Sequence, residues 1–130
     1  SKGHRIIFHE NMNHDEVIKF LPLCKIYWHA RGYGETDDMA MENFGICTVE
    51  GMAAGCVPIV IKLGAQPEIV EHKKNGFVWD SPEELLRYTN ILIKKPRLMK
   101  KLSKNAIKKA LTYDISKFEK RILNVVNQLI

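Results

Sequence analysis

The sequence predicts a doubly wound α/β domain with a parallel sheet, and three observations lead to this prediction. Short apolar runs rich in β-branched residues alternate with longer segments of helical periodicity. The chain has 130 residues, the usual length of one domain, which indicates a single domain over residues 1–130. Its composition of 45% apolar and 27% charged residues excludes disordered and collagen-like classes.

Four strands are expected, because four short runs combine apolar and β-branched residues. In chain order these runs are residues 5–9, 25–29, 57–61 and 77–79. The third run is the most strongly apolar, as in a strand that is covered on both faces. The turn before the fourth run is expected at Asn75-Gly76.

Helices are expected between and after the strands, where apolar residues recur on one face. In chain order they start at Asn13 or His14 and then span about 48–54, 66–70, 82–93, 96–111 and 115–129. Gly55 stands where a left-handed cap ends the second helix, and Ser81, Pro82 and Glu84 make a strong helix start. Pro96 separates the fourth helix from the fifth.

The periodic apolar positions assign a core-facing side to these helices. They are Val17, Phe20 and Leu21 in the first helix; Leu85, Leu86, Thr89, Leu92 and Ile93 in the fourth; and Leu98, Leu102, Ala106 and Ala110 in the fifth.

The net charge of +5 is unevenly distributed: residues 1–93 carry a net charge of −4 and residues 94–130 a net charge of +9. Eight cations lie between Lys94 and Lys109. The favoured interpretation is the solvated face of a helix, and the second is peripheral contact with an anionic membrane surface. Nucleic acid is not expected as a partner, because the segment has few aromatic residues and no recognition module.

The cysteines and histidines indicate neither a disulfide framework nor a metal site. Cys24, Cys47 and Cys56 form no C-x-x-C pair, and the five histidines are scattered. We therefore expect no metal ion, and a reducing, cytoplasmic location.

Ligands of doubly wound sheets bind outside the carboxyl ends of the strands, which directs attention to the loops after His29, Ile61 and Trp79. The loop over residues 30–43 is long enough to be functional. Just beyond it, Glu42 and Glu50 stand eight residues apart on either side of a Phe-Gly bend and a helix start. A helix start binds anions, and a carboxylate accepts hydrogen bonds from two adjacent hydroxyls. Together these features suit a sugar nucleotide.

A larger set of motifs surrounds this pair. In chain order it comprises Glu42-Asn43-Phe44-Gly45, Glu50-Gly51-Met52-Ala53-Ala54-Gly55-Cys56-Val57-Pro58-Ile59-Val60, Gly64-Ala65, Pro67-Glu68-Ile69-Val70 and Asn75-Gly76-Phe77. The set resembles the donor-binding half of retaining GT-B glycosyltransferases of family 4, the "glycosyl transferase group 1" class. The resemblance covers about residues 5–125, is strongest over 42–79, and implies a Rossmann-like domain that lacks its first elements.

The resemblance assigns roles to particular residues. It implies that Glu42 contacts the hydroxyls of the donor sugar and is the candidate catalytic residue, and that Glu50 holds the ribose hydroxyls. The other implied donor-binding residues are Asn43, Phe44, Gly45, Ile46 and Gly64. His29 is a further candidate, for the diphosphate, and a purely structural role is its alternative. Glu68 matches the glutamate after the paired glycines, where a structural role is equally expected.

The sequence departs from the family pattern at three small positions. Gly51 stands where alanine is usual, Ala65 where a second glycine is usual, and Asn43 where glycine is common. Exchanges of this size at a helix face cost about 1 kcal/mol or less, so the site is expected to survive them.

By resemblance, the activity is retaining transfer of a hexose from a nucleotide-diphosphate sugar, without cofactor or metal. The implied acceptor is a glycan, a lipid-linked glycan or a small glycoside. The basic C-terminal segment is compatible with work at the cytoplasmic face of a membrane. The chain looks like a fragment that lacks its partner, the N-terminal GT-B domain, and is expected to be inactive alone. The alternatives are a glycogen or starch synthase-like domain and a non-catalytic nucleotide-sugar-binding subunit.

Overall fold

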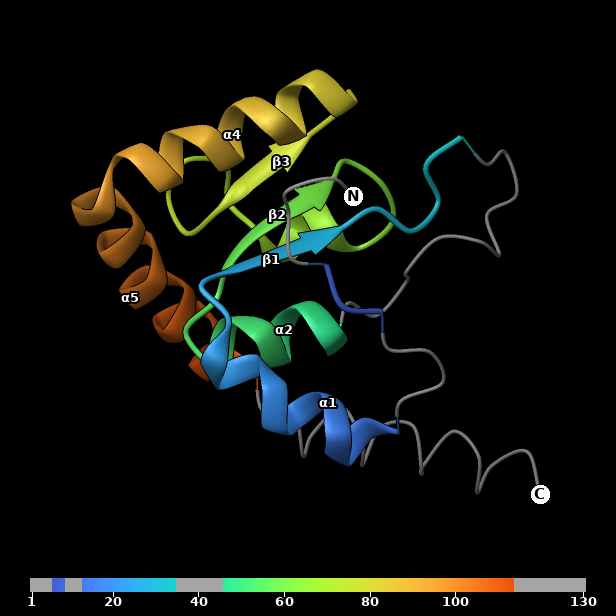
Figure 1. The fold of residues 1–130 in the computed structure, drawn as a ribbon, viewed down its shortest axis with the longest axis vertical. Coiled ribbons are helices and arrows are strands. Elements are labelled where there is room, and N and C mark those ends of the chain that lie inside the picture. Colours follow the sequence, from blue (N-terminus) through green and yellow to red (C-terminus); the bar gives the residue numbers. More distant parts are fainter. Residues whose placement is uncertain (1–5, 9–12, 35–45, 114–130) are drawn as a thin grey trace.

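The computed structural model describes residues 6–8, 13–34 and 46–113 of the chain. The elements in these ranges are α1 (His14–Phe20), the 3-10 helix η1 (Leu21–Leu23), β1 (Ile26–His29), α2 (Ile46–Ala53), β2 (Val57–Ile61), α3 (Gln66–Ile69), β3 (Phe77–Trp79), α4 (Pro82–Lys94) and α5 (Pro96–Thr112). Strands and helices alternate from β1 to α4 (Figure 1), which confirms the predicted α/β class.

The three strands form one parallel sheet in the order β1-β2-β3. β2 lies in the middle and is buried at all five positions, as its unbroken apolar run predicts. Trp28 of β1 and Phe77 of β3 both pair with Ile59, which fixes the register of the sheet.

The side chains of β2 alternate between two apolar clusters, one on each face of the sheet. Ile59 and Ile61 belong to the cluster that contains Leu92 of α4, whereas Val60 belongs to the cluster that contains Met52 of α2. Figure 1 shows α4 and α2 on opposite sides of the sheet. Both faces are therefore covered, as in a doubly wound domain.

α5 contributes to both clusters, through Leu102 on one side and Ala106 and Ala110 on the other. The Ser103 hydroxyl donates to the Gly55 carbonyl oxygen at 2.7 Å, just before β2 begins. The Asn105 side chain donates to the Lys74 carbonyl oxygen at 2.7 Å, in the turn before β3. These contacts place α5 beside the amino ends of the strands.

The predicted helix boundaries are largely confirmed. The Asn13 side chain accepts from the Glu16 amide at 2.9 Å and caps α1, and the Ser81 hydroxyl accepts from the Glu84 amide at 3.3 Å and caps α4. Gly55 has a φ of 95°, the left-handed conformation expected after α2. Among the described residues, no helix is both long and apolar enough to cross a membrane.

Four expectations about the elements need correction or comment. Residues 6–8 are not a strand: Phe8 is 85% exposed, and no described strand pairs with this segment. α2 begins at Ile46, two residues earlier than predicted. Leu86 and Ile93 are 57% and 60% exposed, so part of the predicted apolar face of α4 is turned to solvent. The helix expected over 115–129 lies outside the described residues.

His72 attaches the turn before β3 to the sheet. Its Nδ1 accepts from the Val78 amide at 2.9 Å, and its ring lies edge-on to Phe77 and Tyr88. Partial desolvation of the His72 ring, together with the positive charge of Lys73, lowers the pKa of His72 below its ordinary value. The neutral ring is therefore the form that the fold stabilises.

Gly76→Ala should destabilise the protein by about 1–3 kcal/mol, because the packed core resists an added methyl group. A Cβ at Gly76 would lie 2.4 Å from the Pro58 carbonyl oxygen, an atom of the central strand that cannot move aside. Urea unfolding measures the change. The matched control is Gly51→Ala, whose Cβ meets only the Tyr27 ring at 3.3 Å in a helix that favours alanine. Equal losses in both variants would contradict this account of Gly76.

The unfolding free energy should decrease as the pH falls below the ordinary His72 pKa of 6.5. Because the folded-state pKa is lowered, the unfolded chain binds the proton more readily, so this contribution is complete above the unfolded pKa and is lost below it. Urea titrations between about pH 7.5 and pH 5 measure the slope. His72→Gln keeps a side-chain acceptor that does not titrate and should flatten the slope; an unchanged slope in this variant would exclude His72 as its source.

Candidate functional site

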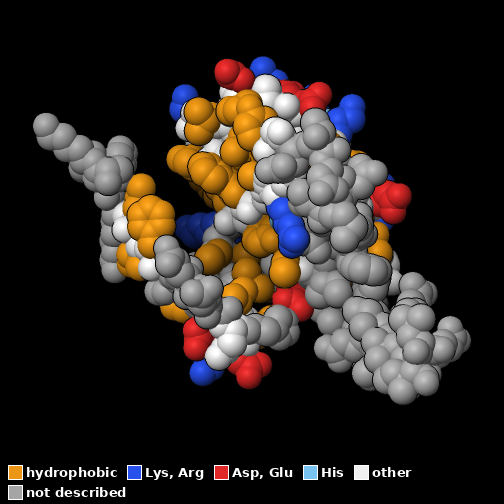
Figure 2. All heavy atoms as spheres, turned by 90° about the vertical axis from the view of Figure 1, so that its right-hand side faces the viewer, with side chains coloured by type: hydrophobic (Ala, Val, Ile, Leu, Met, Phe, Trp, Pro, Cys, Tyr) orange, Lys and Arg blue, Asp and Glu red, His pale blue; other side chains and the backbone are white. Residues whose placement is uncertain are grey.

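The candidate site lies at the edge of the sheet where the three parallel strands end. β1 ends at His29, β2 at Ile61 and β3 at Trp79. The arrowheads of these strands point the same way in Figure 1, and the same end of the molecule holds the start of α2. Figure 2 shows this face of the molecule, where apolar side chains (orange) gather in the centre, between the residues drawn in grey.

Trp79 connects the strand ends to the loop that follows β1. Its indole Nε1 donates to the His29 carbonyl oxygen at 3.1 Å, and its ring centroid lies 5.6 Å from that of Tyr33. The Trp79 carbonyl oxygen accepts from the Lys62 amide at 2.9 Å, where the chain leaves β2. The buried indole thus contacts the end of β1 and the loop after it, and the Trp79 backbone contacts the end of β2.

α2 is held by packing on several sides. Val49 and Met52 are fully buried in the cluster shared with α5, and Gly51 lies against the Tyr27 ring of β1. The first turn of α2, at residues 46–48, carries backbone N–H groups that the helix itself does not satisfy. A helix start fixed in this way is suited to binding an anion.

Thr48 and Gln66 form a buried polar pair that joins the first turn of α2 to α3. The Thr48 hydroxyl donates to Gln66 Oε1 at 2.7 Å, and both residues are 0% exposed. Gln66 Nε2 has no hydrogen-bond acceptor among the described residues. Because the two amide atoms share one carbon, this donor also lies beside the first turn of α2.

Glu50 is located one turn inside α2 and is 6% exposed. A rise of about 1.5 Å per residue places its backbone about 6 Å along the axis from Ile46. Burying a carboxylate is unfavourable unless polar groups surround it. A buried Glu50 is therefore a polar position within a helix that otherwise packs against the core.

Gly64 and His29 occupy neighbouring strand ends. Gly64 has a φ of 60°, a conformation that favours glycine, in the turn between β2 and α3. His29 is 8% exposed at the end of β1, and its ring centroid lies 6.4 Å from that of Tyr27. This location does not decide between the two predicted roles of His29, and its role toward a ligand stays a proposal.

Four predicted donor-binding residues lie outside the described ranges: Glu42, Asn43, Phe44 and Gly45. Ile46 is the first residue of α2. The structure thus brings Glu50, Gly64 and the start of α2 to the same part of the fold, while the geometry of Glu42 relative to Glu50 stays a prediction.

Sequence reasoning missed three residues of this region, namely Thr48, Gln66 and Trp79. The available signal for Thr48 was a hydroxyl residue in the first turn of a helix whose other residues, apart from Glu50, are apolar or small. Gln66 and Trp79 gave no such signal, because their roles arise from partners 18 and 50 residues away in the sequence.

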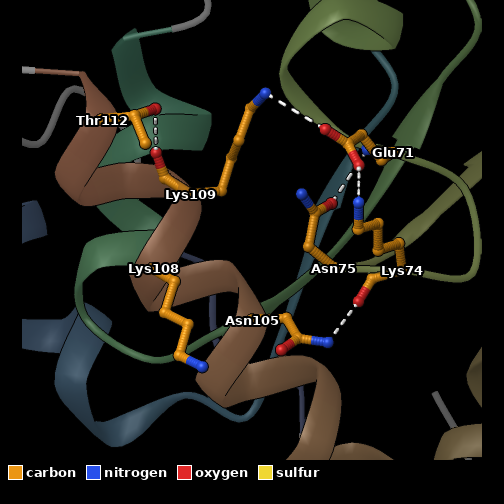
Figure 3. A pocket seen from close by; sticks show the side chains of 7 residues that line it. All are labelled: Glu71, Lys74, Asn75, Asn105, Lys108, Lys109 and Thr112. Atoms are coloured by element: carbon orange, nitrogen blue, oxygen red, sulfur yellow. Dashed lines mark hydrogen bonds and ion pairs between the residues drawn. The ribbon is translucent and has the colours of Figure 1, made fainter.

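A polar hollow lies elsewhere on the surface, and ion pairs and hydrogen bonds join several of the residues that line it. It has a volume of about 270 Å³ and lies between α5 and the turn before β3 (Figure 3). Glu71 is held by Lys74 at 3.2 Å and Lys109 at 3.3 Å, and its backbone amide donates to the Asn75 side chain at 2.9 Å. Both cations lower the Glu71 pKa, Lys74 most strongly. These contacts attach the turn to α5 and give the hollow a structural role.

Comparison with known proteins identifies the family. Residues 1–109 match the model of the family described as glycosyl transferases group 1. No curated protein matches the chain.

Solved structures with a similar fold include the following three. HepE from Anabaena in complex with UDP-glucose has a TM-score of 0.66 and 24% identity over 87% of this chain and 30% of that one. HepE in complex with UDP gives 0.64 and 24% over 85% and 29%. The C-terminal domain of LpcC from Francisella tularensis, a glycosyl transferase group 1 family protein, gives 0.63 and 24% over 82% and 51%.

The chain thus spans less than a third of the HepE chains and about half of the LpcC domain. The shared part includes a parallel sheet with helices on both faces, in agreement with the architecture of the described residues. With the family model matching most of its length, the chain belongs to the glycosyl transferases group 1 family.

Proposed function

We propose that this chain forms the nucleotide-sugar-binding part of an enzyme that transfers a hexosyl group, with retention, to a glycan, lipid-linked or small-glycoside acceptor. The observation that carries the proposal is the family match over residues 1–109. HepE, a structural neighbour, is in complex with UDP-glucose and with UDP, which makes UDP-sugars the first donors to test.

The start of α2 is proposed to bind the donor diphosphate. Its unsatisfied N–H groups and the helix dipole attract negative charge, most strongly where water is excluded. The bond from the anomeric carbon to the diphosphate breaks, the acceptor hydroxyl oxygen bonds to that carbon, and the hydroxyl proton leaves to solvent. The departing diphosphate gains charge at this location. The proposal therefore needs no metal ion and no cofactor.

Carboxylates are proposed to hold the hydroxyls of the donor. Glu50 accepts from the two ribose hydroxyls, and Glu42 accepts from the sugar hydroxyls, with Asn43, Phe44, Gly45 and Ile46 forming the bend between them. The burial of Glu50 supports its part, since hydrogen bonds to a charged acceptor are stronger away from water.

Gln66 is proposed to donate to the bound donor. Its Nε2 is buried beside the first turn of α2 and has no acceptor among the described residues, and a phosphate oxygen would supply one. Gly64 lies two residues before Gln66, and the absence of a side chain there would allow the backbone to approach the same phosphate group.

Glu50→Gln in the full natural chain should weaken UDP-glucose binding by about tenfold or more, because a hydrogen bond to a charged group contributes about 1.5–3 kcal/mol. Isothermal titration measures the dissociation constant, and the anomeric proton coupling of the product reports retention. The exposed Glu83 of α4 provides the matched control, Glu83→Gln, which should bind as the wild type does.

Failure of the folded wild-type protein to bind UDP-, GDP- or ADP-sugars would contradict the proposed function. Preference for ADP-glucose with a glucan acceptor would replace it with the synthase-like alternative. Binding without turnover would replace it with a non-catalytic subunit.

Thr48→Val and Gln66→Leu should each destabilise the protein by about 1–3 kcal/mol, since each leaves one polar partner buried alone. The double variant should lose at least about 1 kcal/mol less than the sum, because both polar groups are then absent. Urea unfolding of the four proteins measures this coupling. UDP-glucose binding should be weaker in the double variant than in the wild type, even though the double variant loses less stability than the sum of the single variants. Strictly additive losses of stability would refute a coupled pair.

A further inference from the structure

α5 carries several lysine and arginine residues and no acidic residue. The helix spans Pro96–Thr112 and contains no aspartate or glutamate. Of its cations, five are exposed to solvent: Arg97, Lys100, Lys101, Lys104 and Lys108. We call these five residues the α5 cation stripe. Lys109 is not part of it, because its ammonium group is paired with Glu71 at 3.3 Å.

The α5 cation stripe occupies one side of the helix. At about 100° per residue, its members fall within an arc of about 100°. The arc is opposite the buried residues Leu102, Ala106 and Ala110, which face the core. The stripe runs for about 16 Å along the axis, at about 1.5 Å per residue from Arg97 to Lys108.

The charge of the stripe is not neutralised within the described part of the chain. The ion pairs found there join Glu71 to Lys74 and Lys109, and Glu84 to Arg87, and involve no member of the stripe. Like charges one turn apart on a helix repel each other, and a glutamate at such positions would have stabilised the helix. The unpaired cations therefore lower the stability of the helix, and they leave five positive charges available to an external anionic surface.

The stripe also surrounds a hollow that could receive an anionic group. The hollow has a volume of about 300 Å³, and its lining consists of the five cations and Asn105. Its donors are ammonium, guanidinium and amide groups, which suit a phosphate or carboxylate group.

Exposed apolar side chains lie beside one end of the stripe. Ile93, in the last turn of α4, is 60% exposed. A second hollow, at the junction of α4 and α5, is lined by Lys95, Pro96, Arg97 and Leu98. Cations with neighbouring apolar groups match the headgroup and acyl layers of a bilayer surface. α5 contains no aromatic residue, so base stacking offers nucleic acid little there.

We propose that the α5 cation stripe docks the protein on an anionic phospholipid bilayer. The stripe lies beside the amino ends of the strands, as the contacts of Ser103 with Gly55 and of Asn105 with Lys74 show. The candidate sugar-nucleotide site lies at the opposite edge of the sheet. Docking therefore leaves that site open, and the proposal stands independently of the function proposed above.

The test is sedimentation of the full natural chain with phosphatidylcholine vesicles that contain about 30% phosphatidylserine. The wild type should bind these vesicles at low salt and dissociate from them as the salt concentration rises. It should not bind vesicles of pure phosphatidylcholine. The triple variant Lys100→Gln/Lys101→Gln/Lys104→Gln should bind about 100-fold more weakly, at about a fivefold loss per cation. The charge-matched control Lys19→Gln/Lys62→Gln/Arg87→Gln removes three exposed cations that lie on α1, after β2 and on α4, and it should bind nearly as the wild type does.

Equal losses in the two triple variants would overturn the proposal, because net charge alone would then explain binding. Binding to pure phosphatidylcholine, or no binding to the anionic vesicles at low salt, would also overturn it. Stripe-dependent binding to single-stranded RNA without vesicle binding would reassign the stripe to nucleic acid. UDP-glucose affinity, measured in parallel, should be unchanged in the stripe variant, and this measurement distinguishes failure of the docking proposal from failure of the donor site.

Discussion

The burial of α2 is the constraint on which the candidate site depends. Apolar contacts of Val49 and Met52 hold one side of the helix, and Gly51 allows it to approach the Tyr27 ring of β1. The Thr48–Gln66 hydrogen bond then fixes its first turn against α3. Because the helix cannot rotate without leaving the core, its N–H groups and Glu50 keep fixed positions relative to the strand ends. Preorganisation of this kind is what an anion-binding site requires.

Local sequence predicted the elements that carry their own signals. The unbroken apolar run Val57–Ile61 indicated a buried strand, and Ser81 with Pro82 marked a helix start, because each signal lies within a few residues. Residues 6–8 show the limit of such signals: the apolar run is present, but a strand also needs a hydrogen-bonded neighbour, and no described strand supplies one. Partners distant in the sequence decide this outcome, and a single run does not reveal them.

The same distinction applies to the candidate site. Glu50 and Gly64 were identified by motifs, and the structure places Glu50 in α2 and Gly64 in a turn after β2, where it has a positive φ. Gln66 was unpredictable as a site residue, because its hydrogen-bond partner is the Thr48 hydroxyl, 18 residues earlier in the chain. The relation of Glu42 to Glu50 depends on residues outside the described ranges and stays a prediction from sequence.

The uneven charge of the sequence corresponds to two ends of the fold. The cations of α5 gather beside the amino ends of the strands, whereas the sugar-nucleotide site is proposed at their carboxyl ends. The five residues of β2 separate these edges by about 16 Å, at about 3.3 Å per residue. This separation exceeds the screening length of about 8–10 Å at physiological salt. The basic helix therefore adds little attraction for a diphosphate at the far edge, and the start of α2 and residues around it must supply that attraction locally.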